Sequence, residues 1–189
     1  MKLCVFQGTF NPIHNAHIKM AEHVLKNFDF DKIIFIPAFK PPHKDYNQSI
    51  TPHRLQMVKL ITNYNNKFEV SDIEYRNNRP SYTYLTILEL YKKYKIDGKI
   101  NFIIGTDAFK NIDTWYEAEK LKPLLKFIVF RRENEEEVHI NNCDYEYTVM
   151  PLCNISSTEI RDKIKNGANI DKLVDKKVKR YIEENGLYK

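Results

Sequence analysis

The chain has 189 residues, a formal net charge of +5 at pH 7, and hydrophobic and aromatic contents of 42% and 13%. This length predicts a single domain, 1–189, and the apolar content excludes an intrinsically disordered chain. No apolar run reaches the roughly 18 residues of a transmembrane helix. The apolar stretch 1–6 at the N-terminus is also too short for a signal peptide. We therefore expect a cytoplasmic protein with no membrane partner.

The charged residues and cysteines narrow the class of protein further. Lysines and arginines are spread along the chain and interrupted by the acidic run 133–137. Proteins that bind nucleic acid usually gather their basic residues in a stripe with a recognisable docking motif, so we expect no nucleic-acid partner. The three cysteines, Cys4, Cys143 and Cys153, agree with a reducing compartment, and none has the spacing of a metal ligand.

Short apolar runs alternate with helical patterns along the chain. We expect strands over 3–6, 32–37, 68–72, 99–105, 126–130 and, from a weaker pattern, 145–150. Helices are expected over 16–28, 51–63, 81–94 and 115–121, and Thr51-Pro52 has the pattern of an N-cap and a first helical residue. Two further helices close the chain. The last one ends near Asn185-Gly186 and places six apolar residues on one face: Ile170, Leu173, Val174, Val178, Tyr181 and Ile182.

This alternation predicts an α/β fold, a Rossmann-like doubly wound parallel sheet with helices on both faces. In such sheets, ligands bind beyond the carboxyl ends of the strands, where the strand order reverses. We therefore expect the functional residues in the loops that follow residues 6, 37, 104 and 130.

The loop after the first expected strand leads into a helix that begins with two histidines. His14 and His17 are three residues apart and lie on one side of the first helical turn. The free N–H groups and the positive dipole end of this helix point into the expected cleft, where imidazoles can donate hydrogen bonds to phosphate oxygens. Gly8 allows a tight turn and a close approach of backbone to ligand. The spacing is also compatible with two surface histidines or with a metal site, although no carboxylate or cysteine stands at the spacing of a zinc motif.

A second candidate site begins at Ser156. Ser156 followed three residues later by Glu159 is a capping box, which is a common helix start. Arg161 lies one turn inside this helix, on the same face as Ser157 and Thr158. Hydroxyls, free backbone N–H groups and a guanidinium then converge on one place, as the binding of a phosphate chain requires. The capping role and the phosphate role are compatible.

Three more segments follow expected strands. The rigid basic loop 40–44 comes after the second strand. Gly105-Thr106-Asp107 ends the fourth strand, where Asp107 is suited either to ribose hydroxyls or to capping the next helix. Trp115 and Tyr116 are typical core residues, but beside a strand-end cleft they can also stack on a flat ring.

Together these segments resemble the nucleotidyltransferases that carry an H-x-G-H motif and a later I-S-S-T-x-I-R motif, and more narrowly the bacterial nicotinate-nucleotide adenylyltransferase family. The resemblance runs along the whole chain, over 8–17, 41–44, 80–83, 105–107, 115–116, 155–161 and 177–188. The two phosphate motifs indicate the superfamily. The segments 80–83 and 115–116 indicate the narrower family, because in it they lie at the mononucleotide site.

The resemblance implies a reaction in which ATP and nicotinate mononucleotide give nicotinate adenine dinucleotide and pyrophosphate, with Mg²⁺ accompanying the triphosphate and no residue acting as a metal ligand. The implied catalytic residues are His14, His17, Lys44 and Arg161, with His17 at the α-phosphate and Lys44 near the reacting phosphates. The implied ATP-binding residues are Gly8, Thr9, Phe10, His14, His17, Gly105, Asp107, Ile155, Ser156, Ser157 and Arg161. The implied mononucleotide-binding residues are Lys44, Thr83, Trp115, Tyr116 and Arg132, with Trp115 stacked on the pyridine ring and the Tyr116 backbone N–H on the carboxylate.

Three residues depart from the family pattern. Gln7 replaces a glycine, Asn11 an aspartate, and Ala16 the glycine between the two histidines. None of these changes removes a hydrogen-bond donor to phosphate, so we expect activity to be retained. Ala16 also suits a position that is already helical, since alanine tolerates helical backbone better than glycine does.

Other functions stay open at this point. One is a related transferase that acts on nicotinamide mononucleotide, phosphopantetheine or a phospho-alcohol. Another is a nucleotide-binding module with weak catalysis, which Ala16 leaves open. An RNA-binding protein is disfavoured because no stacking platform or RNA-binding module is visible. A homo-oligomer is compatible with the sequence.

Overall fold

The computed structural model describes residues 1–42, 47–131, 135–149 and 155–189. Within these ranges the strands form one six-stranded sheet in the order β3-β2-β1-β4-β5-β6, and every neighbouring pair is parallel. The register places Cys4 of β1 opposite Ile33 of β2 on one side and Asn101 of β4 on the other. The strands are β1 (Leu3–Gly8), β2 (Lys32–Pro37), β3 (Phe68–Val70), β4 (Ile100–Gly105), β5 (Leu125–Arg131) and β6 (Asp144–Val149).

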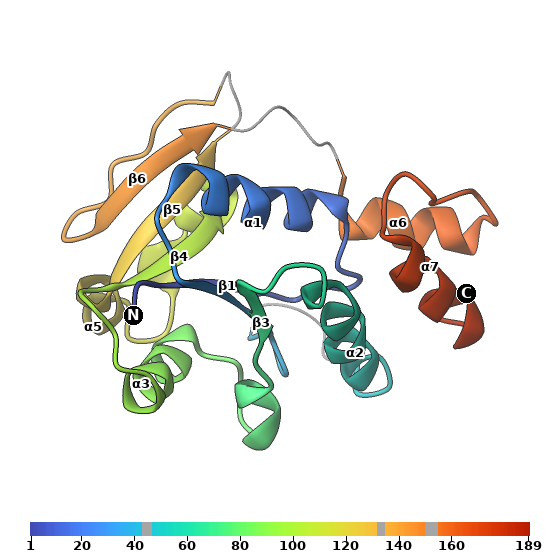
Figure 1. Cartoon of the computed structure of the whole chain (residues 1–189), viewed down its shortest axis with the longest axis horizontal. Helices are drawn as coiled ribbons and strands as arrows, with labels where there is room; N and C mark the ends of the chain where they lie inside the picture. The colour runs from blue at the N-terminus through green and yellow to red at the C-terminus, as the bar shows by residue number, and fades with distance from the viewer. Residues whose placement is uncertain (43–46, 132–134, 150–154) are drawn as a thin grey trace.

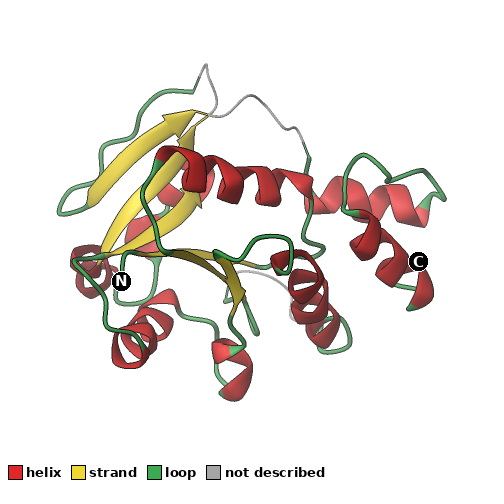
Figure 2. Cartoon of the chain, viewed as in Figure 1, coloured by secondary structure: helices red, strands yellow, loops and turns green. Residues whose placement is uncertain are grey.

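The helices that follow these strands are shown in red in Figure 2. The α-helices are α1 (Asn15–Asn27), α2 (Thr51–Thr62), α3 (Thr83–Lys93), α4 (Thr106–Phe109), α5 (Ala118–Leu121), α6 (Ser157–Lys165) and α7 (Lys176–Glu184). Short 3₁₀ helices lie between them: η1 (Ile73–Arg76), η2 (Ile112–Thr114) and η3 (Lys122–Leu124). Within the described ranges, every helix lacks the length or the apolar character needed to cross a membrane.

Alternation along β1 divides the core into two layers, because successive side chains of a strand point to opposite faces of the sheet. Cys4 and Phe6 pack with buried residues of α1, α2, α6 and α7. Leu3 and Val5 pack on the other face with buried residues of α3, α4 and α5. Figure 1 shows α1 above the central strand and α3 below it. The predicted doubly wound Rossmann-like fold is confirmed, and Cys4 is the core residue that its place in the strand indicates.

The order in which the strands are added to the sheet reverses between β1 and β4. From β1 the chain proceeds outward through β2 to β3, then returns to β4 on the other side of β1 and proceeds outward to β6. The carboxyl ends of β1 and β4 therefore border the crevice in which a doubly wound sheet binds its ligands.

Several predicted boundaries were wrong. The helix expected over 115–121 begins only at Ala118, because Glu117 takes a left-handed φ of 54° that breaks the helical path. Ile50, not Thr51, is the N-cap of α2, and the Thr51 hydroxyl donates to the backbone oxygen of Asn47. The predicted strand 68–72 ends at Val70.

The last helix is also shorter than its apolar pattern predicted. It begins at Lys176, and Asp175 caps it by accepting a hydrogen bond from the Lys177 N–H. Ile170 and Val174 lie before the helix but are buried in the same core layer as Val178. The apolar pattern therefore predicted burial correctly and helical structure incorrectly.

Candidate active site

The loop after β1 is held by an aromatic residue that turns back onto it. Phe10 is buried, has a left-handed φ of 47°, and its ring lies edge-on to Phe6 at a centroid distance of 5.5 Å. A Cβ atom at Gly8 would stand 3.0 Å from the Phe10 ring. The absence of a Cβ atom at Gly8 therefore lets this ring pack closely on the backbone, a more local reason for glycine than the close ligand approach expected from sequence.

His14 and His17 form the start of α1, as predicted. His14 is the N-cap, and its backbone N–H donates to Nδ1 of His17 at 3.3 Å. The two imidazole rings stack with their centroids 3.7 Å apart, and His17 also lies edge-on to Phe10 at 5.0 Å. Burial lowers the pKa of His14 to about 4. At neutral pH His14 is thus an uncharged imidazole, which can offer one N–H to a ligand.

The start of α6 faces the same loop from the far end of the chain. Ser156 caps α6 by accepting a hydrogen bond from the Glu159 N–H at 3.1 Å, which confirms the predicted capping role of this serine. The Ser157 hydroxyl donates to the backbone oxygen of Pro12 at 2.9 Å. Arg161 donates to the backbone oxygen of Asn11 at 2.8 Å. The start of α6 therefore holds the loop after β1 directly.

These two helix starts enclose a cleft of about 1070 Å³, which we call the polar cleft. Its walls bring together imidazoles, hydroxyls, a guanidinium and the N-termini of two helices, all of which favour an anionic ligand. It is lined by Thr9, Phe10, Asn11, His14, Ala16, His17, Met20, Pro42, Ile155, Ser156, Ser157, Thr158 and Arg161.

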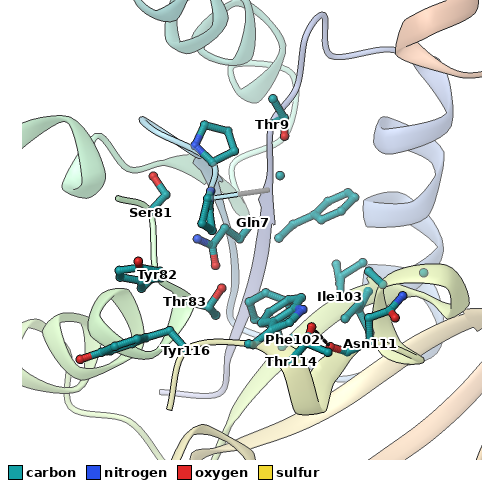
Figure 3. A pocket seen from close by; sticks show the side chains of 18 residues that line it. Gln7, Thr9, Ser81, Tyr82, Thr83, Phe102, Ile103, Asn111, Thr114 and Tyr116 are labelled. Atoms are coloured by element: carbon teal, nitrogen blue, oxygen red, sulfur yellow. Dashed lines mark hydrogen bonds between the residues drawn. The ribbon is translucent and has the colours of Figure 1, made fainter. Parts of the chain in front are cut away.

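A second cavity of about 530 Å³, the aromatic pocket, lies between the carboxyl ends of β1 and β4 (Figure 3). Trp115 lines it and meets Phe102 edge-on at 6.2 Å, while Tyr116 stacks on Tyr82 at 4.4 Å. Thr83, the first residue of α3, lies on the same wall. The lining is Phe6, Gln7, Gly8, Thr9, Pro41, Pro42, Ser81, Tyr82, Thr83, Phe102, Ile103, Ile104, Gly105, Ala108, Asn111, Thr114, Trp115 and Tyr116.

The two cavities meet, since Thr9 and Pro42 line both of them. Thr9 belongs to the loop after β1 and Pro42 to the loop after β2. A polar cleft suited to phosphates thus adjoins an aromatic pocket suited to a flat ring. Two ligands bound side by side can present reacting groups to each other at this junction, which is the geometry that group transfer requires.

A buried arginine that the sequence analysis missed ties the junction together. Arg54 of α2 donates to the backbone oxygens of Thr9 at 2.8 Å, Ala38 at 2.5 Å and Phe39 at 3.0 Å. It is only 2% exposed. Its position in the helix holds the signal, because residues 54, 57, 58 and 61 follow the spacing of one helical face and the other three are apolar. A charge in an apolar stripe indicates a buried residue with partners.

Glu74 is the second buried anchor that was missed. It is 7% exposed in η1 and accepts hydrogen bonds from the Gln7 side-chain amide at 2.5 Å, the Phe39 backbone N–H at 3.2 Å and the Thr86 hydroxyl at 2.7 Å. Burial raises the pKa of this carboxyl, and its hydrogen bonds oppose the shift. Nothing in the sequence of this short 3₁₀ helix distinguishes Glu74 from a solvated carboxylate.

Some predicted site residues do not line the polar cleft, and others fall outside the residues that the structure describes. Gly8 and Gly105 were expected with ATP, but the structure places both in the lining of the aromatic pocket, at the ends of β1 and β4. Asp107 was also expected with ATP; it is exposed in α4 and is not among the residues that line the two cavities. Lys44 and Arg132 fall outside the described residues.

The three departures from the family pattern occupy different places. Ala16 is buried in the first turn of α1 and lines the polar cleft, where its helical backbone suits alanine. Asn11 lies in the same cleft, and its side-chain oxygen accepts a hydrogen bond from Tyr188 at 2.8 Å. Gln7 lines the aromatic pocket (Figure 3). The part of the chain that the structure describes contains no group of three or more His, Cys, Asp or Glu arranged to bind a metal.

The chain is also similar in sequence to known nucleotidyltransferases. A family model described as cytidylyltransferase-like matches residues 5–163. A probable nicotinate-nucleotide adenylyltransferase of Fusobacterium nucleatum is 44% identical over 189 residues, which covers 97% of this chain and 98% of the relative. The nicotinate-nucleotide adenylyltransferase of Bacillus subtilis is 38% identical over 191 residues, covering 99% and 98%.

Solved structures of similar fold were also found. Nicotinic acid mononucleotide adenylyltransferase of Plasmodium falciparum, complexed with NaAD, has a TM-score of 0.77 at 24% identity and covers 99% of this chain and 97% of its own. A putative nicotinate-nucleotide adenylyltransferase of Vibrio parahaemolyticus has a TM-score of 0.68 at 22% identity, with 100% and 96% covered. Because the sequence identities are only 24% and 22%, these structural similarities support the Rossmann-like fold alone.

Proposed function

Because the chain belongs to the cytidylyltransferase-like family, and within it to the nicotinate-nucleotide adenylyltransferases, we propose that it transfers AMP from ATP to nicotinate mononucleotide. The observation that carries this proposal is the junction of the polar cleft with the aromatic pocket at Thr9 and Pro42. A triphosphate in the cleft and a pyridine mononucleotide in the pocket bring the α-phosphorus and the attacking phosphate to that junction.

In the proposed reaction, a phosphate oxygen of the mononucleotide attacks the α-phosphorus of ATP. The bond from that phosphorus to the bridging oxygen breaks, pyrophosphate leaves, and nicotinate adenine dinucleotide remains. No covalent bond to the protein is needed, so catalysis consists of positioning and of stabilising negative charge. The substrate is the magnesium complex of ATP, whose phosphate oxygens are the ligands that Mg²⁺ prefers.

The residues of the polar cleft divide the phosphate contacts between them. We assign His17 to the α-phosphate and His14 beside it as an uncharged donor, consistent with its lowered pKa. We assign Ser156, Ser157 and Arg161 to the β- and γ-phosphates. Arg161 has five N–H donors in a planar fork, so its bond to the Asn11 backbone is compatible with additional bonds to phosphate.

The aromatic pocket is assigned to the nicotinate mononucleotide. Trp115 offers a face on which the pyridine ring can stack. Tyr116 lies in the turn between η2 and α5, and we propose that its backbone N–H binds the carboxylate. We place the reaction in the cytoplasm, which the free thiols of Cys4 and Cys143 support.

The test is pyrophosphate release by the purified protein with Mg²⁺, ATP and one acceptor at a time, followed by mass determination of the product. We expect rapid release with nicotinate mononucleotide and a lower kcat/KM with nicotinamide mononucleotide, because the amide lacks the negative charge of the carboxylate. A higher kcat/KM for the amide would reassign the acceptor. If pyrophosphate is released with neither mononucleotide, the proposed function is wrong.

A further inference from the structure

The C-terminal tail is part of the sequence resemblance, yet the proposed function leaves it without a role. After α7, Gly186 and Tyr188 both take left-handed φ angles, of 58° and 66°, and Leu187 between them is buried in the core layer of α1 and α2. A bulky residue such as tyrosine seldom adopts this backbone conformation, and it is retained where surrounding contacts fix it. The tail is thus built into the molecule and directs Tyr188 toward a defined place.

That place is the wall of the polar cleft. The Tyr188 hydroxyl donates a 2.8 Å hydrogen bond to the side-chain oxygen of Asn11, a residue 177 positions earlier in the chain. The backbone oxygen of Asn11 accepts from Arg161. Asn11 is therefore held at two points, from two separate C-terminal segments, three residues before the N-cap histidine of α1.

The same C-terminal region also holds the first residue of α1. The Asn15 backbone N–H donates to the backbone oxygen of Leu173 at 2.9 Å. The Asn15 side-chain amide donates to the backbone oxygen of Lys172 at 3.1 Å. Figure 1 shows α6 and α7 beside the start of α1. The C-terminal region therefore fixes the histidine turn on both sides, through Asn11 before it and Asn15 after it.

The hydroxyl of Tyr188 is kept in the form that can donate. Burial raises the pKa of Tyr188, while the nearby cations Arg161 and Arg54 oppose the shift. The net effect keeps the phenol protonated throughout the physiological pH range. Its acceptor on Asn11 is a neutral amide oxygen, which cannot be lost by protonation in that range.

We propose that Tyr188 is a positioning residue of the polar cleft, whose hydroxyl holds Asn11 and thereby sets the His14–His17 turn for the ATP phosphates. This inference rests on the proposed function only for the identity of the ligand as ATP. Tyr188 acts through Asn11 and not by contact with the substrate. Its removal weakens ATP binding and leaves the aromatic pocket as it was.

The test compares Tyr188→Phe with a matched control, Tyr181→Phe. Tyr181 is also in the C-terminal region, and its hydroxyl is hydrogen-bonded to Nδ1 of His53 at 2.9 Å; neither residue lines the polar cleft. Each variant loses one hydroxyl and one hydrogen bond. Calorimetric binding of a non-hydrolysable ATP analogue with Mg²⁺ supplies the readout, together with the melting temperature of each variant.

We expect Tyr188→Phe to raise the Kd for the analogue about fivefold, the effect of one net hydrogen bond, and Tyr181→Phe to leave it unchanged. Asn11→Ala removes the acceptor, so adding Tyr188→Phe to it should weaken binding no further. An unchanged Kd in Tyr188→Phe overturns the proposal, and so does an equal loss in Tyr181→Phe, which would indicate general packing. Because binding is measured without turnover, the answer does not depend on which acceptor the enzyme uses.

Discussion

The polar cleft and the aromatic pocket meet at one loop but are constructed differently. The cleft is formed by the two ends of the chain, residues 9–20 and 155–161, joined by hydrogen bonds from side chains to backbone oxygens. Apart from the loops that both cavities share, the pocket is formed mainly by residues 81–116, whose aromatic rings pack on β4 and α3. The cleft therefore depends on contacts between residues far apart in sequence, and the pocket depends mostly on local packing.

Because of this difference, experiments can distinguish effects on ATP from effects on the mononucleotide. A side chain of the cleft should affect ATP and the rate of transfer, and a side chain of the pocket should affect the mononucleotide alone. Arg54 and Glu74 are shared anchors, since both hold Phe39 in the loop that leads to Pro42. Outside these two anchors, a variant that changes only one substrate constant supports the division, and a variant that changes both equally contradicts it.

The largest effect is expected at His17. His17→Ala removes a donor from the α-phosphate, and losses of a comparable donor lower kcat by about 10²–10³. His23→Ala is the matched control, because His23 lies further along α1 and binds Thr148 outside the cleft. Pyrophosphate release measures kcat, and urea unfolding should show a loss of no more than about 1 kcal/mol for His17→Ala. Equal kcat values in the two variants would rule out the role of His17.

Trp115 is expected to show the next largest effect, confined to the pocket. Stacking of a ring on an aromatic side chain is worth about 1–3 kcal/mol, so Trp115→Ala should raise KM for nicotinate mononucleotide about 5–150-fold. The KM for ATP serves as the internal control and should change less than about twofold. A parallel rise in both constants would show that the two cavities are not independent.

The pH dependence of stability provides a test specific to the cleft. Burial lowers the pKa of His14 from its ordinary value of about 6.5 to about 4, so between these values the unfolded chain binds more protons than the folded chain. The contribution of His14 to the free energy of unfolding is complete above about pH 6.5 and is lost as the pH falls toward 4. Between pH 7 and pH 5, the wild type should lose about 2 kcal/mol more unfolding free energy than His14→Asn, which retains a good N-cap residue. Equal losses in urea titrations at the two pH values would show that His14 titrates normally.

The smallest effect is expected at Gln7. Its side-chain amide donates to Glu74 and fixes one wall of the aromatic pocket. Gln7→Met keeps the length of the side chain without the donor, and the loss of one hydrogen bond should raise KM for the mononucleotide about fivefold. Steady-state kinetics with ATP held at saturation measure this constant. A KM equal to that of the wild type would mean that the bond to Glu74 does not shape the pocket.

The sequence predicted the sheet well, because buried parallel strands are short apolar runs flanked by turn residues. It was least successful where a single residue overrides a pattern. The left-handed conformation of Glu117 delays α5, and the Asp175 cap sets the start of α7 after apolar residues that also fit a helix. Neither event leaves a periodic signal in the sequence.

The same contrast applies to the candidate site. His14, His17 and Ser156 could be predicted because helix starts have local sequence signatures. The apolar stripe around Arg54 indicates that this residue is buried, but its partners could not be predicted, because only the folded chain brings the loop after β1 and the loop after β2 to it. Glu74 could not be predicted, because its partners come from separate segments of the chain and leave no local signal around it. Charged residues are most often solvated, so the burial of one that lies outside an apolar pattern, such as Glu74, becomes visible only in the three-dimensional arrangement.

The most direct test of two adjoining cavities is a crystal structure of the protein with nicotinate adenine dinucleotide bound. We predict that the adenylate lies in the polar cleft beside His17, that the pyridine ring lies on Trp115, and that the linking phosphates cross the junction at Thr9. A dinucleotide bound wholly within one cavity, or outside both, would contradict this prediction.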